Sequence, residues 1–317
     1  MSLIRWDDDI EYYQKTREQG IRGVTSKIVN CGPVIGVCVP LNKKMLPLLM
    51  FLFVTSTLAD DCSHKFHRMN YSRSAILTIK GLPTNLEFNS QTKDLYFTLI
   101  DMETLQNDEV QTKMDQYILR NGEPIKIENV NGQAAAVDYD NDKVYIASDD
   151  GLHILNKTGR AHFVAMKDED IVQLFKPRHS DNIYAVFYPN NEVFKFNLTS
   201  NEKERVENVP CAYILAVDGD DNIYYECESK YVRVLLKGFQ ESIEFMGIPK
   251  NSARAITTND DSDVVLAAND GLYWLRADNI IPKKMMDLDY IPAGIAFNGD
   301  TFYISTTDVI YKYEMCQ

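Results

Sequence analysis

"VYIASDDGLHIL", residues 144–155, contains two short apolar segments joined by a tight acidic turn. Tetrads like its first four residues, most with tyrosine second, occur six times: "LYFT" 95–98, "VYIA" 144–147, "IYAV" 183–186, "IYYE" 223–226, "VVLA" 264–267 and "FYIS" 302–305. Their first residues are 49, 39, 40, 41 and 38 positions apart. A period near 40 residues is typical of one blade of a β-propeller.

Each repeat has room for about four strands. Most tetrads follow a segment rich in small apolar residues, such as "AAAVDY", "YILAV" or "AGIAF", which suits an inner strand beside a crowded axis. A third segment comes after the tetrad, such as "GLHIL", "EVFKF" or "GLYWL". An irregular β-sandwich would also contain many short strands. Because the spacing is nearly constant, we predict an all-β fold, a six-bladed β-propeller.

The last repeat supplies only three strands before the chain ends near Cys316. We expect "SAILTIKG", residues 74–81, to pair beside 309–313 as the missing outer strand and so to close the ring. This arrangement brings Cys62 close to Cys316. Cys211 and Cys227 flank two paired strands of the fourth repeat. The sequence therefore predicts two disulfides, and the pairs are Cys62–Cys316 and Cys211–Cys227.

The segment before the repeats resembles a secretory signal. Residues 46–59 form an apolar run, too short to span a bilayer comfortably, that ends in small residues before Asp60. We predict a signal peptide at 45–59, with a buried helix or an uncleaved anchor as alternatives. Residues 1–44 are interpreted as an upstream extension or a poorly ordered tail. The propeller is then expected to comprise residues 60–317.

Three N-x-S/T sequons favour an extracellular location, and they begin at Asn70, Asn156 and Asn197. Together with the paired cysteines they predict a secreted, disulfide-bonded glycoprotein. The formal net charge of −13 argues against a nucleic-acid or anionic-membrane partner, since phosphate binding requires clustered Lys and Arg. A monomer is expected.

No nucleophile elbow, dinucleotide fingerprint or P-loop is present, and the repeats contain only His153, His162 and His179. Acidic turns at 138–142, 218–222 and 259–263 do not match a calcium-loop pattern and are interpreted as solvated hairpin turns. We therefore predict no catalytic residues, no metal and no cofactor, that is, a protein that is not an enzyme. The alternative is a metal-dependent hydrolase or lactonase of propeller type, with Asp218 and Glu226 as candidate site residues.

A ring of six blades offers a pocket on one face, where loops between strands meet. In these loops Tyr188 and Tyr290 are candidates for stacking on a planar ligand. Lys167, Lys230 and Lys250 are candidates for contact with an anionic group.

The stretches "DKVYIASDDGLHILN", "DNIYAVFYPNNEVFKF" and "NDGLYWLRADNIIPKKMMDLDYIPAGIAFNGD", with the ending "VIYKYEMC", resemble the ommochrome-binding proteins of Lepidoptera. The resemblance covers roughly residues 60–317. It implies a non-enzymatic carrier in the haemolymph that binds a planar, tryptophan-derived pigment. No binding residue follows from the resemblance itself.

Overall fold

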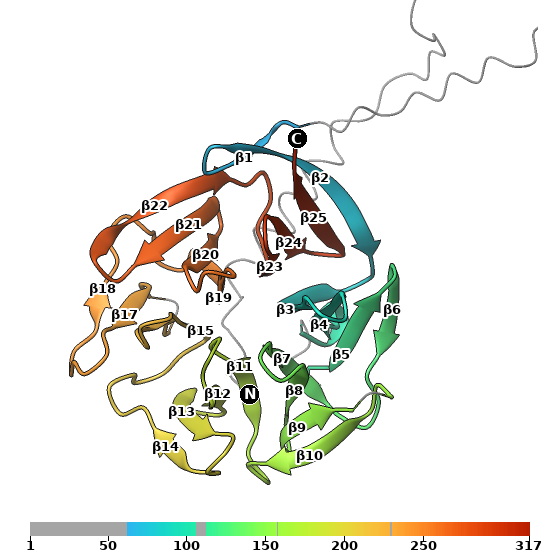
Figure 1. The fold of residues 1–317 in the computed structure, drawn as a ribbon, viewed down its shortest axis with the longest axis vertical. Coiled ribbons are helices and arrows are strands. Elements are labelled where there is room, and N and C mark those ends of the chain that lie inside the picture. Colours follow the sequence, from blue (N-terminus) through green and yellow to red (C-terminus); the bar gives the residue numbers. More distant parts are fainter. Residues whose placement is uncertain (1–61, 106–111, 157, 229) are drawn as a thin grey trace, which may run out of the picture. The chain divides into compact units, whose positions relative to one another are not determined.

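The computed structural model describes residues 62–105, 112–156, 158–228 and 230–317. The predicted upstream extension and signal peptide lie outside these described residues. The described chain forms six antiparallel sheets around a common axis, which confirms the predicted all-β, six-bladed β-propeller (Figure 1). Its one described helix is α2 (Met102–Leu105), and no described helix is long and apolar enough to span a membrane.

The blades are built as follows. Blade 1 contains β3 (Leu82–Asn89), β4 (Asp94–Ile100), β5 (Met114–Arg120) and β6 (Glu123–Lys126). Blade 2 contains β7 (Gly132–Asp138), β8 (Lys143–Ser148), β9 (Gly151–Leu155) and β10 (Ala161–Ala165). Blade 3 contains β11 (Ile171–Phe175), β12 (Asn182–Phe187), β13 (Glu192–Asn197) and β14 (Lys203–Arg205).

Blade 4 contains β15 (Ile214–Val217), β16 (Ile223–Glu226), β17 (Arg233–Leu235) and β18 (Ile243–Glu244). Blade 5 contains β19 (Ala253–Thr258), β20 (Val264–Ala268), β21 (Gly271–Arg276) and β22 (Asn279–Asp287). Blade 6 contains β23 (Gly294–Asn298), β24 (Thr301–Thr306), β25 (Val309–Met315), β2 (Met69–Thr78) and β1 (His64–Phe66).

The six tetrads all lie on the second strand of a blade, where both faces are covered by neighbouring blades. Six hydrophobic clusters follow from this, one at each interface between adjacent blades. In β8, for example, Tyr145 and Ala147 pack toward blade 3, whereas Val144 and Ile146 pack toward blade 1. Successive side chains of the second strand point to opposite faces of the sheet, and each face packs against a neighbouring blade. Both sets of side chains are therefore buried, which explains why the tetrads are continuously apolar.

The ring is closed by the N-terminal strand, as predicted. β2 pairs antiparallel with β25, and Ala75 lies opposite Tyr311. The observed strand begins and ends earlier than the predicted 74–81, and β1 adds a fifth strand outside it. The Cys62–Cys316 disulfide joins the segment before β1 to the residue that follows β25, with its Cα atoms 6.2 Å apart.

Blade 4 is the smallest blade, with strands of four, four, three and two residues. The second predicted disulfide, Cys211–Cys227, connects the segments that precede β15 and follow β16. It therefore fastens the blade that has the least strand pairing of its own.

Candidate functional site

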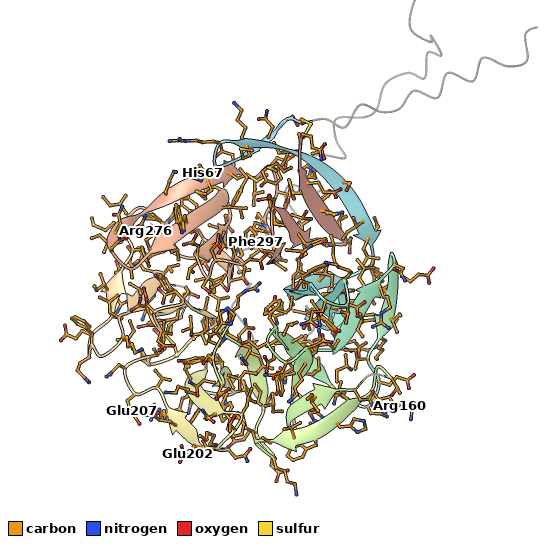
Figure 2. The ribbon with its side chains drawn as sticks, viewed as in Figure 1. His67, Arg160, Glu202, Glu207, Arg276 and Phe297 are labelled. Atoms are coloured by element: carbon orange, nitrogen blue, oxygen red, sulfur yellow. A yellow bond between two sulfur atoms is a disulfide. The ribbon has the colours of Figure 1, made fainter. Side chains whose placement is uncertain are left out.

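The inner strands of the blades enclose a narrow axial channel. Two cavities lie along it, with volumes of about 20 and 40 Å³. Glu87, Leu174, Phe175 and Thr257 line both cavities, so these residues lie at the middle of the channel. Phe297 of β23, which lines the smaller cavity, lies close to the axis, whereas Arg160, Glu202, Glu207 and Arg276 lie at the outer rim (Figure 2). Cavities of this size have room for a few water molecules.

Glu87 places a carboxyl group inside this channel. Its neighbours on β3, Leu86 and Phe88, are buried between blades 6 and 1, so strand alternation directs Glu87 the other way, toward blade 2. There the hydroxyl oxygen of Tyr139 lies 3.1 Å from Glu87 Oε1 and 2.9 Å from the carbonyl oxygen of Phe88. Burial raises the pKa of Glu87 to about 7, although bonds from Tyr139 and the backbone of Val137 and the charge of Arg178 oppose the shift.

Arg178 closes the end of the channel at which the inner strands finish. Its guanidinium carbon lies 3.9 Å from the centre of the Tyr139 ring, within cation–π distance. The same guanidinium forms an ion pair with Asp260, in the turn between β19 and β20, and Asp260 also accepts a hydrogen bond from the backbone of Gly299. Contacts from blades 2, 3, 5 and 6 therefore meet across the axis.

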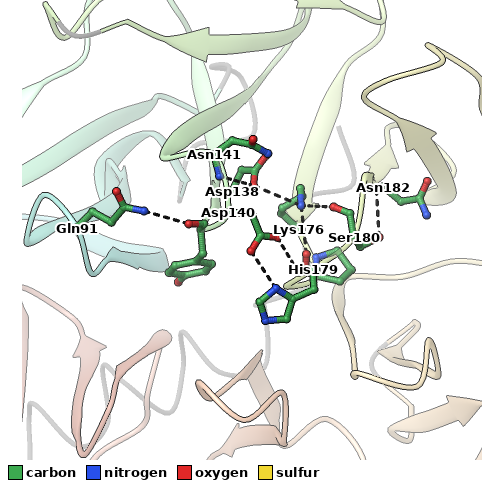
Figure 3. A network of polar contacts seen from close by, with 10 residues as sticks. Gln91, Asp138, Asp140, Asn141, Lys176, His179, Ser180 and Asn182 are labelled. Atoms are coloured by element: carbon green, nitrogen blue, oxygen red, sulfur yellow. Dashed lines mark hydrogen bonds and ion pairs between the residues drawn. The ribbon is translucent and has the colours of Figure 1, made fainter.

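A polar network on the same face joins blades 1, 2 and 3 (Figure 3). Asp140 accepts hydrogen bonds from the backbone nitrogen of His179 and contacts its ring Nδ1, both at 2.9 Å. The buried ammonium of Lys176 lies 3.7 Å from Asp138 and donates to the carbonyl oxygens of Pro177 and Ser180. Lys176 is thus held by the fold, whereas Glu87 and Arg178 both line the smaller cavity, and the charge of Arg178 acts on Glu87.

The opposite end of the channel is also polar. Asn85 donates to the carbonyl oxygen of Gln133 at 2.8 Å, and Gln133 donates to Asp170 at 2.6 Å. Arg254, which lines the larger cavity, donates to Asn269 at 2.6 Å. Arg254 therefore places a cationic side chain at this end of the channel as well.

The channel does not fit a divalent cation. The charged residues that line its two cavities are one carboxylate, Glu87, and three cations, Lys176, Arg178 and Arg254. Calcium requires several oxygen ligands, commonly carboxylates. Within the described ranges, only one group of three potential ligand side chains was found, Cys211, Cys227 and Glu228, and both cysteines are oxidised in a disulfide.

The residues suggested for a metal-dependent hydrolase do not converge. Asp218 follows β15 and accepts hydrogen bonds from the backbone of Asp220 and Asn222 in its own hairpin turn. Glu226 pairs with Ile214 at the other end of the same two strands. That assignment was wrong, because the two carboxylates lie at opposite ends of one hairpin.

The predicted ligand residues do not form one site. Tyr290 is engaged within blade 6, where its hydroxyl lies 2.7 Å from that of Tyr313 and Arg73 stacks on its ring. Lys167 is exposed in the turn after β10. The other three lie around one surface pocket. Lys230 lines this pocket, and so does Pro189, the residue after Tyr188. Lys250 lies over the ring of Tyr231, which also lines the pocket.

This surface pocket, the blade 4 pocket, has a volume of about 450 Å³. Its wall includes Tyr213, Tyr225, Tyr231, Arg233 and the Cys211–Cys227 disulfide. A cavity of this size, with aromatic faces and a few charged groups, has the properties of a small-molecule site.

The three sequons differ in their side-chain contacts. Asn70 lies exposed on β2. Asn156 contacts His162 at 2.6 Å, and Asn197 donates to Asn182 at 3.1 Å, so both of these amides are engaged. Glycosylation at the three positions stays a prediction.

Sequence reasoning did not identify Glu87, Tyr139, Arg178 or Asp260. Glu87 lies in "LEFN", residues 86–89, where no residue was singled out, and Asp260 lies in the acidic turn at 259–263, which was interpreted as solvated. One usable signal was a glutamate between two apolar residues, Leu86 and Phe88, of an inner strand.

No family model matches the chain, and no curated protein matches it in sequence. Solved structures do share its fold. A gluconolactonase from Xanthomonas campestris is 8% identical with a TM-score of 0.62, over 82% of this chain and 93% of that one. A presumed gluconolactonase is 10% identical, with a TM-score of 0.59 over 79% and 94%. A protein of unknown function from Bacteroides thetaiotaomicron is 12% identical, with a TM-score of 0.57 over 78% and 76%.

At identities this low, the structural similarity establishes only the fold, which is a six-bladed propeller. The prediction that the protein is not an enzyme is contradicted by this comparison, since similar structures include gluconolactonases. Nothing in these comparisons concerns pigment binding.

Proposed function

We propose that this protein is a propeller hydrolase that opens a small lactone or ester in the axial channel, with Glu87 as its general base. The observation that carries the proposal is a single enclosed carboxyl with a pKa of about 7, beside a fixed guanidinium. A general base is most effective when its pKa lies near the working pH. The gluconolactonase fold relatives support the same class of reaction.

The chemistry follows from the two charged groups. The Glu87 carboxylate accepts a proton from a water molecule while the water oxygen bonds to the carbonyl carbon of the lactone. Arg178 stabilises the negative charge that develops on the carbonyl oxygen. The bond from the carbonyl carbon to the ring oxygen then breaks, and Glu87 returns its proton to that oxygen. The product is a hydroxy acid.

This reaction is derived without a metal, because one carboxylate among three cations does not fit a calcium site. The enclosed cavities have room for a few water molecules but not for a six-membered lactone ring, so substrate binding requires one end of the channel to open.

The test is a panel of lactones and simple esters assayed with the full chain, with and without a chelator. We expect turnover that is insensitive to the chelator and falls about 100-fold or more in Glu87→Gln. Glu123→Gln, an exposed glutamate on β6, is the matched control. Wild-type turnover in Glu87→Gln, or no turnover of any compound by the wild type, would contradict the proposal.

A second candidate function, binding of a planar anionic pigment, is favoured by the blade 4 pocket. The partly exposed rings of Tyr213 and Tyr231 offer aromatic faces there. Lys230 and Arg233 offer positive charge, although each forms an ion pair with a glutamate, Glu228 and Glu244 respectively. The resemblance to ommochrome-binding proteins supports the same class of ligand.

A spectroscopic titration with a xanthommatin-type pigment tests this candidate. We expect saturable binding that weakens about tenfold in Tyr231→Ala and in Lys230→Ala. Lys167→Ala, which removes an exposed lysine on another blade, should leave the affinity unchanged. Equal affinities in all variants would rule out the blade 4 pocket as the binding site.

A further inference from the structure

Arg178 and Asp260 are an unusual pair, because they come from blades that are not neighbours. Arg178 follows β11 of blade 3, and Asp260 lies in the β19–β20 turn of blade 5. The blade between them has a four-residue inner strand, and its turn is bonded internally through Asp218. The ion pair of Arg178 with Asp260 therefore joins blade 3 to blade 5 near the axis, past the short inner strand of blade 4.

We propose that Asp260 is the positioning residue of the channel site: it holds the Arg178 guanidinium against Tyr139, across the end of the channel next to the smaller cavity that Glu87 lines. The proposal rests on the function proposed above. Asp260 does not contact Glu87 in the described structure and acts through Arg178.

Three contacts define the position of the guanidinium and its partner. Arg178 stacks on Tyr139, whose hydroxyl contacts Glu87, and this fixes one side. The ion pair with Asp260 fixes the other side, and the backbone of Gly299 orients the Asp260 carboxylate. The side chain of Arg178 is 16% exposed and that of Asp260 is 39% exposed, so the pair lies at the mouth of the channel.

The charged and titratable groups around Glu87 determine in which direction its pKa should shift when Asp260 is replaced. Tyr139 and Arg178 act on it directly, Arg254 and Lys176 line the same channel, and Asp138 pairs with Lys176. Arg178 lowers the pKa of Glu87, so its displacement raises that pKa. Removing the negative charge of Asp260 would by itself lower it. An upward shift in an Asp260 variant therefore reports movement of Arg178 and not the lost charge.

The experiment compares Asp260→Asn with Asp261→Asn in the full chain. Asp261 is exposed in the same turn, so its variant makes the same change of charge. The Glu87 carboxyl is titrated by NMR with carbon-13-labelled glutamate, its signal assigned by loss in Glu87→Gln. We expect the Glu87 midpoint to move above its wild-type value in Asp260→Asn and to stay unchanged in Asp261→Asn. An unchanged or lower midpoint in Asp260→Asn would overturn the proposal.

Kinetics supply the second readout. If lactone or ester turnover is found, Asp260→Asn should lower kcat about 10-fold with little change in KM, because Arg178 is no longer held where charge develops. The pH profile of kcat/KM should shift to higher pH in the same variant. The NMR titration requires no turnover, so failure of the proposed function and failure of the Asp260 proposal are separately detected.

Discussion

At the scale of single residues, the channel depends on how Glu87 is enclosed. Most buried acids in proteins are paired with a cation that lowers their pKa, but for Glu87 burial outweighs Arg178 and Tyr139. The result is a carboxyl that changes charge near neutral pH. Such a group destabilises the fold when ionised, which suits a residue kept for function.

The pH dependence of stability follows directly. In the unfolded chain Glu87 ionises near its usual pKa of 4.5, and in the folded chain near 7. Its contribution to stability is therefore fully present below pH 4.5 and is lost as the pH rises through 7. Glu87→Gln cannot ionise, so its free energy of unfolding should increase relative to wild type between pH 4.5 and 7.5.

Urea unfolding at these two pH values checks this prediction, with Glu123→Gln as the control for loss of an exposed carboxyl. If Glu87→Gln and wild type lose stability in parallel across this range, the raised pKa of Glu87 is wrong.

At the scale of elements, each second strand is the core of two blade interfaces. Ile146 of β8 is fully buried between blades 1 and 2. Ile146→Ala should lower the free energy of unfolding by about 2–5 kcal/mol, through lost burial and the cavity left behind. Ile281→Ala on β22, where the side chain is 65% exposed, should change stability by about 0.5 kcal/mol or less. Equal effects of the two substitutions, measured by urea unfolding, would contradict this account of the core.

The strands were predictable because their signal is local. Each apolar tetrad, its acidic turn and its small-residue partner lie within about 20 residues, and the repeat period gives the number of blades. The channel site was not predictable in this way. Glu87, Arg178 and Asp260 come from three blades, and only ring closure brings them to the axis. An aspartate in a hairpin turn looks the same in sequence whether it faces water or a guanidinium across the ring.

At the scale of the whole molecule, stability depends on keeping the ring closed. β2 joins the last blade from the other end of the chain, and Cys62–Cys316 fastens it over a separation of 254 residues. Cys211–Cys227 spans only 16 residues. In the chain-entropy model the long loop contributes about 5 kcal/mol and the short one about 3 kcal/mol.

Removal of each disulfide as a double cysteine-to-serine variant tests this difference. We expect the variant without Cys62–Cys316 to lose more stability to urea than the variant without Cys211–Cys227. The opposite order would show that blade 4, and not ring closure, limits stability.

The central claim is that Glu87 is the base of a hydrolytic site, and the pH dependence of kcat/KM on the best lactone or ester substrate tests it most directly. Because the base must be ionised, we predict a rate that rises with pH and levels off above a midpoint near 7, with this midpoint lost in Glu87→Gln and kept in Glu123→Gln. A profile that is flat from pH 5 to 9, or one that Glu87→Gln leaves in place, would contradict the claim.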